Sequence, residues 1–254
     1  MSYREQATIK RTACLGTGIY EMWMETENIA KEAKPGQFIS VYSNDGSRLL
    51  PRPISICRVA DNELRIVYRV AGKGTDEFSK MTAGQTLNIQ GPLGNGYDLS
   101  TGAHKKAILF GGGIGIPPML QLAAQLDGEK EIVLGYRDEL FLNQEFEQFG
   151  HVTIATEDGS TGTKGNVLDA VREHAITGDV IYACGPTPML RAIREYALEH
   201  NIEAYISLEE KMACGIGACL ACVCKSTEKD AHSQVHNKRV CKEGPVFNVK
   251  EVEL

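Results

Sequence analysis

The chain has 254 residues, of which 43% are hydrophobic and 24% charged, and its formal net charge is −6. This length allows two packed domains and a short third module. The acidic balance argues against a nucleic-acid surface, and no apolar run approaches the roughly 20 residues that cross a bilayer. Because the first residues, MSYREQ, lack the apolar stretch of a secretory signal, the sequence predicts a cytoplasmic protein without a membrane or nucleic-acid partner.

Residues 1 to about 100 are predicted to form a β barrel. Short alternating runs rich in β-branched and aromatic residues cover 37–42, 63–70 and 86–90, as is typical of strands. Turn-forming pairs with Gly, Pro, Asn or Asp separate the runs, and short strands at this spacing suggest a barrel. Two isolated cysteines, Cys14 and Cys57, lie beside strand-like residues, so we expect both to be buried.

Strands alternate with helices after residue 102. Apolar runs predict strands, and one segment predicts a helix with proline in its first turn. This alternation indicates βαβ units and a parallel sheet. From about residue 209 the chain becomes rich in Cys and Gly. We therefore predict a β barrel over 1–100, an α/β domain over 101–208 and a small Cys-rich module over 209–254.

The first strand of the predicted α/β domain ends in a glycine-rich turn. Its glycines are Gly111, Gly112, Gly113 and Gly115. Glycines let the backbone approach a diphosphate, and the start of the following helix favours an anion. A strict G-x-G-x-x-G spacing is absent, so a purely structural turn is the alternative.

A later strand of the same domain, over 180–183, ends in the turn Cys184-Gly185-Pro186. The ends of parallel strands meet at the carboxyl edge of the sheet, where ligands bind in open α/β folds. Cys184 could face a bound ring there, and a simple buried thiol is the equally weighted alternative.

Two segments of the predicted barrel carry groups suited to a phosphorylated ligand. Arg52-Pro53-Ile54-Ser55 offers a guanidinium that can fork onto a phosphate and a hydroxyl that can bind a ring heteroatom. On its own, however, Arg52 reads as a surface arginine. The strand at 67–70 runs into a glycine turn ending at Thr75, and such a turn can point N–H groups at an anion.

The Cys-rich module carries a metal-ligand spacing. Cys214, Cys219 and Cys222 form C-x₄-C-x₂-C, the spacing of plant-type [2Fe–2S] sites, and thiolates suit this soft chemistry. A fourth thiol can come from Cys224 or from Cys241. Four thiolates can also hold zinc, which is the competing metal.

Taken together, the motifs R-P-x-S, G-x-G-T, G-P-x-G, G-G-G-x-G-x-P-P and C-G-P resemble the ferredoxin-NADP reductase superfamily over roughly residues 5–208. The resemblance implies an antiparallel six-stranded FAD-binding barrel and a pyridine-nucleotide domain. It assigns FAD to Arg52, Pro53, Ile54, Ser55, Val67, Tyr68, Arg69, Gly74 and Thr75. It assigns the nicotinamide dinucleotide to Gly111, Gly112, Gly113, Gly115, Cys184, Gly185 and Pro186.

The segment 209–222, together with 240–247, is similar to the electron-transfer subunits of class B, NAD-dependent dihydroorotate dehydrogenases of pyrimidine biosynthesis. This resemblance implies FAD, a [2Fe–2S] cluster and an FMN-containing catalytic partner subunit, in a heterotetramer of two plus two chains. It also implies that the cluster ligands are Cys214, Cys219, Cys222 and Cys241, because the last ligand in the family precedes an E-G-P-V-F type segment.

The chemistry of the implied cofactors fixes the order of electron transfer. A nicotinamide exchanges two electrons at once and the cluster exchanges one, so FAD must lie between them as the converter. We find no catalytic residue for dihydroorotate itself, and we expect the six histidines, among them His232, to be solvated. Oxidation of the substrate is therefore expected in the partner.

The choice of dinucleotide and of partner stays open in part. Arg137, at the end of a predicted strand, could meet a 2′-phosphate and would favour NADP, whereas the neighbouring Asp138 and the class B resemblance favour NAD. Related flavin and iron–sulfur subunits serve sulfide dehydrogenase, glutamate synthase-like or hydrogenase complexes. A zinc-stabilised nucleotide-binding regulator is the alternative that is not an enzyme.

Overall fold

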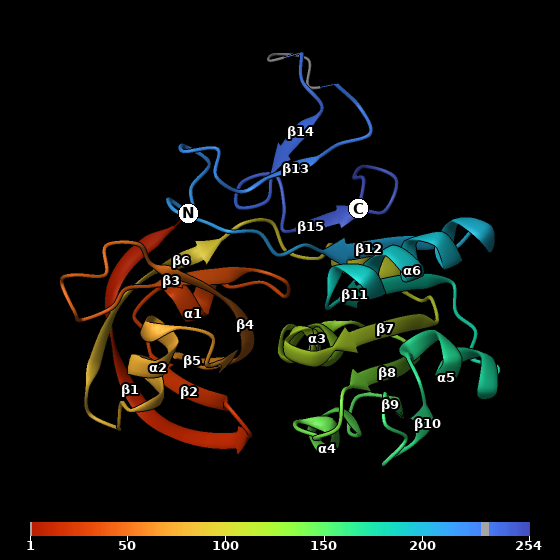
Figure 1. Cartoon of the computed structure of the whole chain (residues 1–254), viewed down its shortest axis with the longest axis horizontal. Helices are drawn as coiled ribbons and strands as arrows, with labels where there is room; N and C mark the ends of the chain where they lie inside the picture. The colour runs from red at the N-terminus through yellow and green to blue at the C-terminus, as the bar shows by residue number, and fades with distance from the viewer. Residues whose placement is uncertain (1, 230–233) are drawn as a thin grey trace.

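Six antiparallel strands close into a barrel in the N-terminal part of the chain (Figure 1). The computed structural model describes residues 2–229 and 234–254. The strands follow the order β1-β2-β5-β4-β3-β6. Their inward side chains, such as Ile39 and Ile66, are fully buried. The bounds are β1 Tyr3–Gly16, β2 Ile19–Glu25, β3 Phe38–Val41, β4 Arg52–Ala60, β5 Glu63–Arg69 and β6 Thr86–Leu93, with helices α1 Ile29–Glu32 and α2 Lys73–Ser79.

Of the two barrel cysteines, Cys57 is buried as expected, but the prediction for Cys14 is wrong because its side chain is exposed. The pairing of β1 with β2 shifts register between Ile9 and Arg11 and again between Cys14 and Gly16. A bulge moves the following side chains relative to the core face, so apolar neighbours in the sequence do not bury this thiol.

The second part of the chain forms a seven-stranded sheet in the order β10-β9-β8-β7-β11-β12-β15. All pairs in it are parallel except β12 with β15, which confirms the predicted α/β class. Helices α3, α5 and α6 pack along it (Figure 1). The bounds are β7 Ala107–Gly112, β8 Lys130–Tyr136, β9 His151–Thr156, β10 Thr163–Lys164, β11 Val180–Cys184 and β12 Glu203–Ser207, with η1 Leu99–Gly102, η2 Gly113–Gly115, α3 Ile116–Gln125, α4 Asn143–Phe146, α5 Val167–Glu173 and α6 Thr187–Glu199.

The Cys-rich C-terminal part lies above the other two in Figure 1. It has a short hairpin of β13 (Val223–Lys225) with β14 (Asn237–Arg239), and its last strand, β15 (Val246–Asn248), extends the large sheet. The boundaries predicted at 100/101 and 208/209 remain predictions. In the described residues, no helix is long and apolar enough to cross a membrane.

A buried arginine joins the barrel to the parallel-sheet domain. Arg65 of β5 is only 5% exposed. It donates from Nε to Glu21 of β2 at 2.7 Å and forms a double contact with the carboxylate of Glu145 in α4 at 2.7 and 2.9 Å. Its guanidinium also lies 5.5 Å from the ring centre of Trp23. Such a forked contact has a defined geometry, so it fixes α4 against the barrel.

We predict that Arg65→Met lowers the free energy of unfolding by about 3 kcal/mol, because removal of the largely buried guanidinium leaves the carboxylates of Glu21 and Glu145 without their partner. Urea unfolding can be followed by the fluorescence of Trp23, the single tryptophan of the chain. The matched control is Lys10→Met, which breaks an exposed pair with Glu25 and is expected to cost less than about 1 kcal/mol. Equal losses in the two variants would contradict the prediction.

Candidate functional site

The predicted FAD-binding residues of the barrel gather where β4 meets the start of α2. Arg52 lies so close to Gly74 that a Cβ at that position would be 2.2 Å from Arg52 Nε. A larger residue at position 74 would therefore displace the guanidinium. Among the described residues no carboxylate pairs with Arg52, whose Nη1 donates to the carbonyl oxygen of Leu50. A half-buried guanidinium without a counter-ion suits a phosphate group.

The other members of this predicted set fall into two groups. Thr75 stabilises its own turn, because its Oγ1 accepts from the N–H groups of Ala71 and Gly72 at 2.9 and 3.2 Å. On the strands, Ile54, Val67 and Tyr68 are buried, Pro53 and Arg69 are exposed, and Ser55 is intermediate. The backbone positions of this set are close together, but their side chains do not all face one space.

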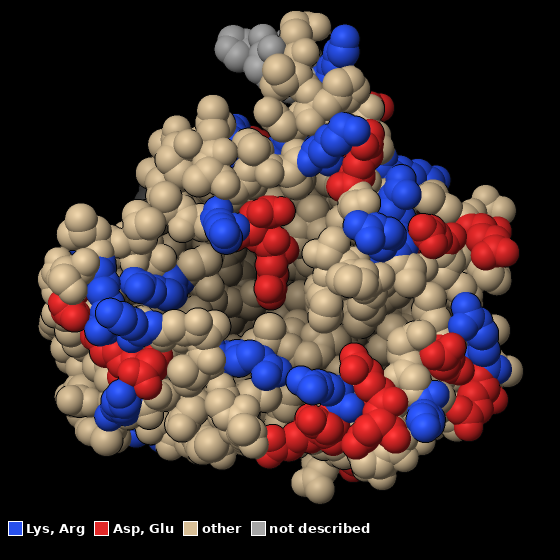
Figure 2. Space-filling model, viewed as in Figure 1, with Lys and Arg blue, Asp and Glu red and all other residues tan. Residues whose placement is uncertain are grey.

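A cavity of about 770 Å³ lies at the carboxyl edge of the parallel sheet. Figure 2 shows the molecule hollowed between its two lobes, with basic and acidic side chains sharing the rim. The ends of β7, β8 and β9 contribute to the cavity, and the barrel contributes Thr17, Ile19 and Arg69. This is the edge at which open α/β sheets bind nucleotides. Its charged lining residues are Arg69, Arg137, Asp138, Glu139 and Glu157.

The predicted dinucleotide residues divide at this cavity. Gly112, Gly113 and Pro186 line it, whereas Gly111, Gly115, Cys184 and Gly185 are not among the lining residues. The two turns lie side by side, because Cys184 pairs with Gly111 across β11 and β7.

Gly113 and Gly115 need glycine for different reasons. Gly113 has φ of +52°, and a Cβ there would meet nothing within 4 Å, so its backbone faces open space. At Gly115 a Cβ would lie 2.5 Å from the carbonyl of Cys184. Gly115 therefore packs the glycine turn against β11, while Gly113 leaves room for a ligand.

Cys184 is a buried thiol with polar neighbours. Its side chain is 1% exposed, and burial raises its pKa well above the ordinary value. The hydroxyl of Tyr97 donates to the backbone carbonyl of Ala183 at 3.1 Å. The thiol is thus neutral, and its packing agrees with the alternative that Cys184 is a simple buried thiol.

The predicted cluster ligands are linked by backbone N–H groups that point at sulfur. Cys214 Sγ accepts from Ala218 and Cys219 at 3.3 and 3.4 Å. Cys241 Sγ accepts from Gly217 at 3.1 Å, and Cys222 Sγ accepts from the N–H of Cys241 at 3.4 Å. Hydrogen bonds of this kind favour thiolates and tune iron–sulfur potentials.

The acidities of these thiols differ with their surroundings. Burial raises the pKa of Cys214, but the backbone N–H donors outweigh it and lower that pKa to about 6. Burial and the neighbouring Cys222 raise the pKa of Cys241 to about 12. A bound metal would act in the opposite direction, since coordination favours the deprotonated thiol.

The donor set consists of thiols and backbone N–H groups that face sulfur, and this chemistry fits an iron–sulfur cluster. A [2Fe–2S] cluster is bound by four thiolates divided between two irons. The rival ligand, Cys224, lies on β13 and packs against the hydrophobic core.

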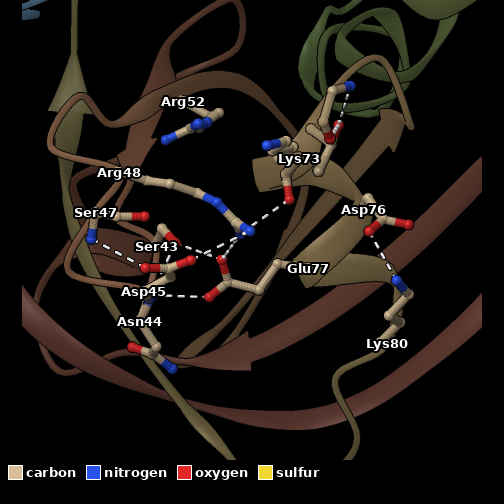
Figure 3. Close-up of polar contacts among 12 residues, drawn as sticks. Ser43, Asn44, Asp45, Ser47, Arg48, Arg52, Lys73, Asp76, Glu77 and Lys80 are labelled. Carbon is tan, nitrogen blue, oxygen red and sulfur yellow. Dashed lines mark hydrogen bonds and ion pairs between the residues drawn. The ribbon is translucent and has the colours of Figure 1, made fainter.

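Sequence reasoning missed residues that shape both sites. Pro188, Met189 and Asn166 line the sheet-edge cavity, and Glu77 of α2 ties down the loop before Arg52 (Figure 3). No spacing motif marks these residues, since they are brought together by strand order. The five described histidines are exposed, as expected, and His232 lies outside the described residues.

Known proteins resemble this chain over its full length. Residues 209–253 match the iron-sulfur cluster binding domain of dihydroorotate dehydrogenase B. The dihydroorotate dehydrogenase B (NAD(+)) electron transfer subunit of Geobacillus sp. (strain WCH70) is 43% identical over 263 residues, with 100% of both chains covered. The same subunit of Listeria monocytogenes serotype 4b (strain F2365) is 42% identical, again with 100% of both chains covered.

Solved structures share the fold. The structure of an NADH-dependent reduced ferredoxin-NADP oxidoreductase superposes with a TM-score of 0.86 at 27% identity, covering 97% of this chain and 89% of that one. A ferredoxin NADP+ reductase from Neisseria gonorrhoeae gives a TM-score of 0.66 at 15% identity, covering 77% and 91% of the two chains. The second likeness concerns the fold alone.

Gly113 and Gly115 provide a test of how the glycine turn is built. We predict that Gly115→Ala destabilises the protein strongly, because the added methyl would meet the β11 backbone at 2.5 Å. Gly113→Ala should cost only about 1 kcal/mol, since it meets the left-handed backbone penalty but no atoms. Thermal unfolding of both variants measures this difference, and a larger loss for Gly113→Ala would contradict it.

Proposed function

Because this chain belongs to the family of dihydroorotate dehydrogenase B electron transfer subunits, we propose that it carries electrons between a catalytic subunit that oxidises dihydroorotate and NAD+. It is an oxidoreductase subunit of pyrimidine biosynthesis that uses FAD, a [2Fe–2S] cluster and NAD. When bound, FAD exchanges electron pairs with the nicotinamide and single electrons with the cluster. The chain itself binds, orients and insulates these groups.

One contact carries the proposal from the structure. The Cys214–Cys222 loop packs directly on the barrel, where a Cβ at Gly215 would be 3.0 Å from Ser40 Oγ and 3.3 Å from a methyl of Leu93. Ser40 of β3 pairs with Pro53 of β4, and neighbouring strands lie about 4.8 Å apart. Cys214, next to Gly215, is thus close to a strand that neighbours the proposed FAD residues, which supports a relay.

The outer side of the same loop fits a docking surface. Ile216 and Leu220 are 50% and 59% exposed, and Cys219 is exposed beside them. A relay works only when its outer cofactor lies close to the partner. We therefore assign this surface to an FMN-containing catalytic subunit, in a complex of two plus two chains.

The ligand assignments are part of the same proposal. We assign the cluster to Cys214, Cys219, Cys222 and Cys241, and the FAD diphosphate to Arg52. The dinucleotide is assigned to the sheet-edge cavity, in which the carboxylates of Asp138, Glu139 and Glu157 outnumber Arg69 and Arg137. An excess of negative charge disfavours a 2′-phosphate and favours NAD. A cytoplasmic location is part of the proposal, since the cysteines of the described residues form no disulfide.

The assignment of Cys241, and not Cys224, as the fourth cluster ligand can be tested by substitution. We predict that Cys241→Ser abolishes the visible absorption of the cluster, because serine oxygen is a poorer iron ligand than thiolate. Cys224→Ser is the matched control and should keep about two irons and two acid-labile sulfides per chain. If Cys224→Ser loses the cluster instead, the fourth ligand has been assigned to the wrong residue.

The division of labour with the partner can be assayed directly. We predict that this chain alone oxidises NADH with artificial acceptors but does not oxidise dihydroorotate. Dihydroorotate-dependent reduction of NAD+ should appear only when the FMN-containing subunit is added. Full activity from this chain without FMN would overturn the relay assignment. Activation by a sulfide dehydrogenase or hydrogenase partner instead would move the chain to another complex.

A further inference from the structure

The carboxylate of Glu77 in helix α2 holds the loop between β3 and β4 (Figure 3). Glu77 accepts hydrogen bonds from the Ser43 hydroxyl, from the backbone N–H of Asn44 at 2.8 Å and from Arg48 Nη1 at 2.5 Å. Its side chain is 19% exposed, and that of Arg48 is 23% exposed. Hydrogen bonds to a charged group at partly buried positions are among the stronger ones in proteins.

Arg48 completes this connection from the loop side. The same Nη1 also donates to the backbone carbonyl of Lys73 at 3.0 Å, and Nη2 lies 3.3 Å from Asp45. The positive charge of Arg48 is therefore balanced within the loop. Within the described residues Arg52 has no carboxylate partner, whereas Lys73 interacts electrostatically with Asp45, so Arg52 is the cation that remains for an anionic ligand.

The loop leads directly into Arg52. Arg52 Nη1 donates to the carbonyl oxygen of Leu50, a residue of the loop, and its Nε lies against Gly74 of α2. Both supports of this guanidinium thus depend on the relative position of the loop and the helix. Glu77 lies at the connection between the loop and the helix on which these supports depend.

We propose that Glu77 is a positioning residue for FAD, which latches the 43–50 loop and orients Arg52 toward the diphosphate. This inference rests on the proposed function, because it takes FAD as the ligand of Arg52. A purely electrostatic role would have the opposite sign, since removing a carboxylate near a diphosphate would tighten binding.

The experiment uses the full-length, cluster-loaded chain from which FAD has been removed. Flavin fluorescence titration gives the dissociation constant of FAD, and limited trypsin digestion reports cleavage after Arg48. The variants are Glu77→Ala and Glu77→Gln. Asp76→Asn is the matched control, because it breaks the exposed pair with Lys80 on the same helix. Arg52→Ala serves as the reference for loss of the guanidinium.

We expect Glu77→Ala to weaken FAD binding about tenfold, or about 1.4 kcal/mol, and to speed cleavage after Arg48. Glu77→Gln keeps an acceptor for Asn44 but loses the charge facing Arg48, so its affinity should lie between those of Glu77→Ala and the unmodified chain. Asp76→Asn should match the unmodified chain in both measurements.

Other results separate the possible failures. If the unmodified chain binds no FAD, the proposed function fails, and the cleavage data alone then decide whether Glu77 latches the loop. If the chain binds FAD and Glu77→Ala binds it equally well or more tightly, the positioning role is wrong. Should Glu77→Ala lose its cluster absorbance through misfolding, Glu77→Gln decides, and unchanged affinity in that variant overturns the proposal.

Discussion

The arrangement of the two large domains depends on the buried guanidinium of Arg65. A charge at this depth is stable only while both of its carboxylate partners, Glu21 and Glu145, stay in place. One partner comes from the barrel and the other from the parallel-sheet domain, so the pair resists any rotation of one domain on the other. The backbone N–H of Thr17, which donates to Glu139 at 2.8 Å, adds a second tie at the rim of the cavity. This constraint keeps the sheet edge facing the barrel.

With the domains fixed, the glycines at the sheet edge take separate roles. The backbone contact at Gly115 packs the turn against β11, and the open position at Gly113 leaves space over the helix start. The same division holds in the barrel, where Gly74 gives room to a protein side chain, Arg52. Glycine-rich motifs thus combine positions that admit a ligand with positions that admit neighbouring parts of the chain.

The Cys-rich module is joined to both other parts. Its strand β15 extends the parallel-sheet domain, and its cysteine loop lies on β3 and β6 of the barrel. An electron relay needs such a placement, since its inner side must be near the flavin and its outer side near the partner. A module attached by a single linker would not hold both distances.

The sequence by itself determined the fold class, the order of the parts and the family, because strand periodicity, glycine turns and cysteine spacing are local patterns. It also identified Arg52, the glycine turn and four cysteines as candidates. Only the tertiary structure decided that Cys14 is exposed, that Gly115 serves packing, and that Glu77 and Arg65 connect separate elements. These features depend on bulges, strand order and contacts between residues far apart in the chain, such as Arg65 with Glu145. No local pattern encodes them, since the physical partners meet only after the chain has folded.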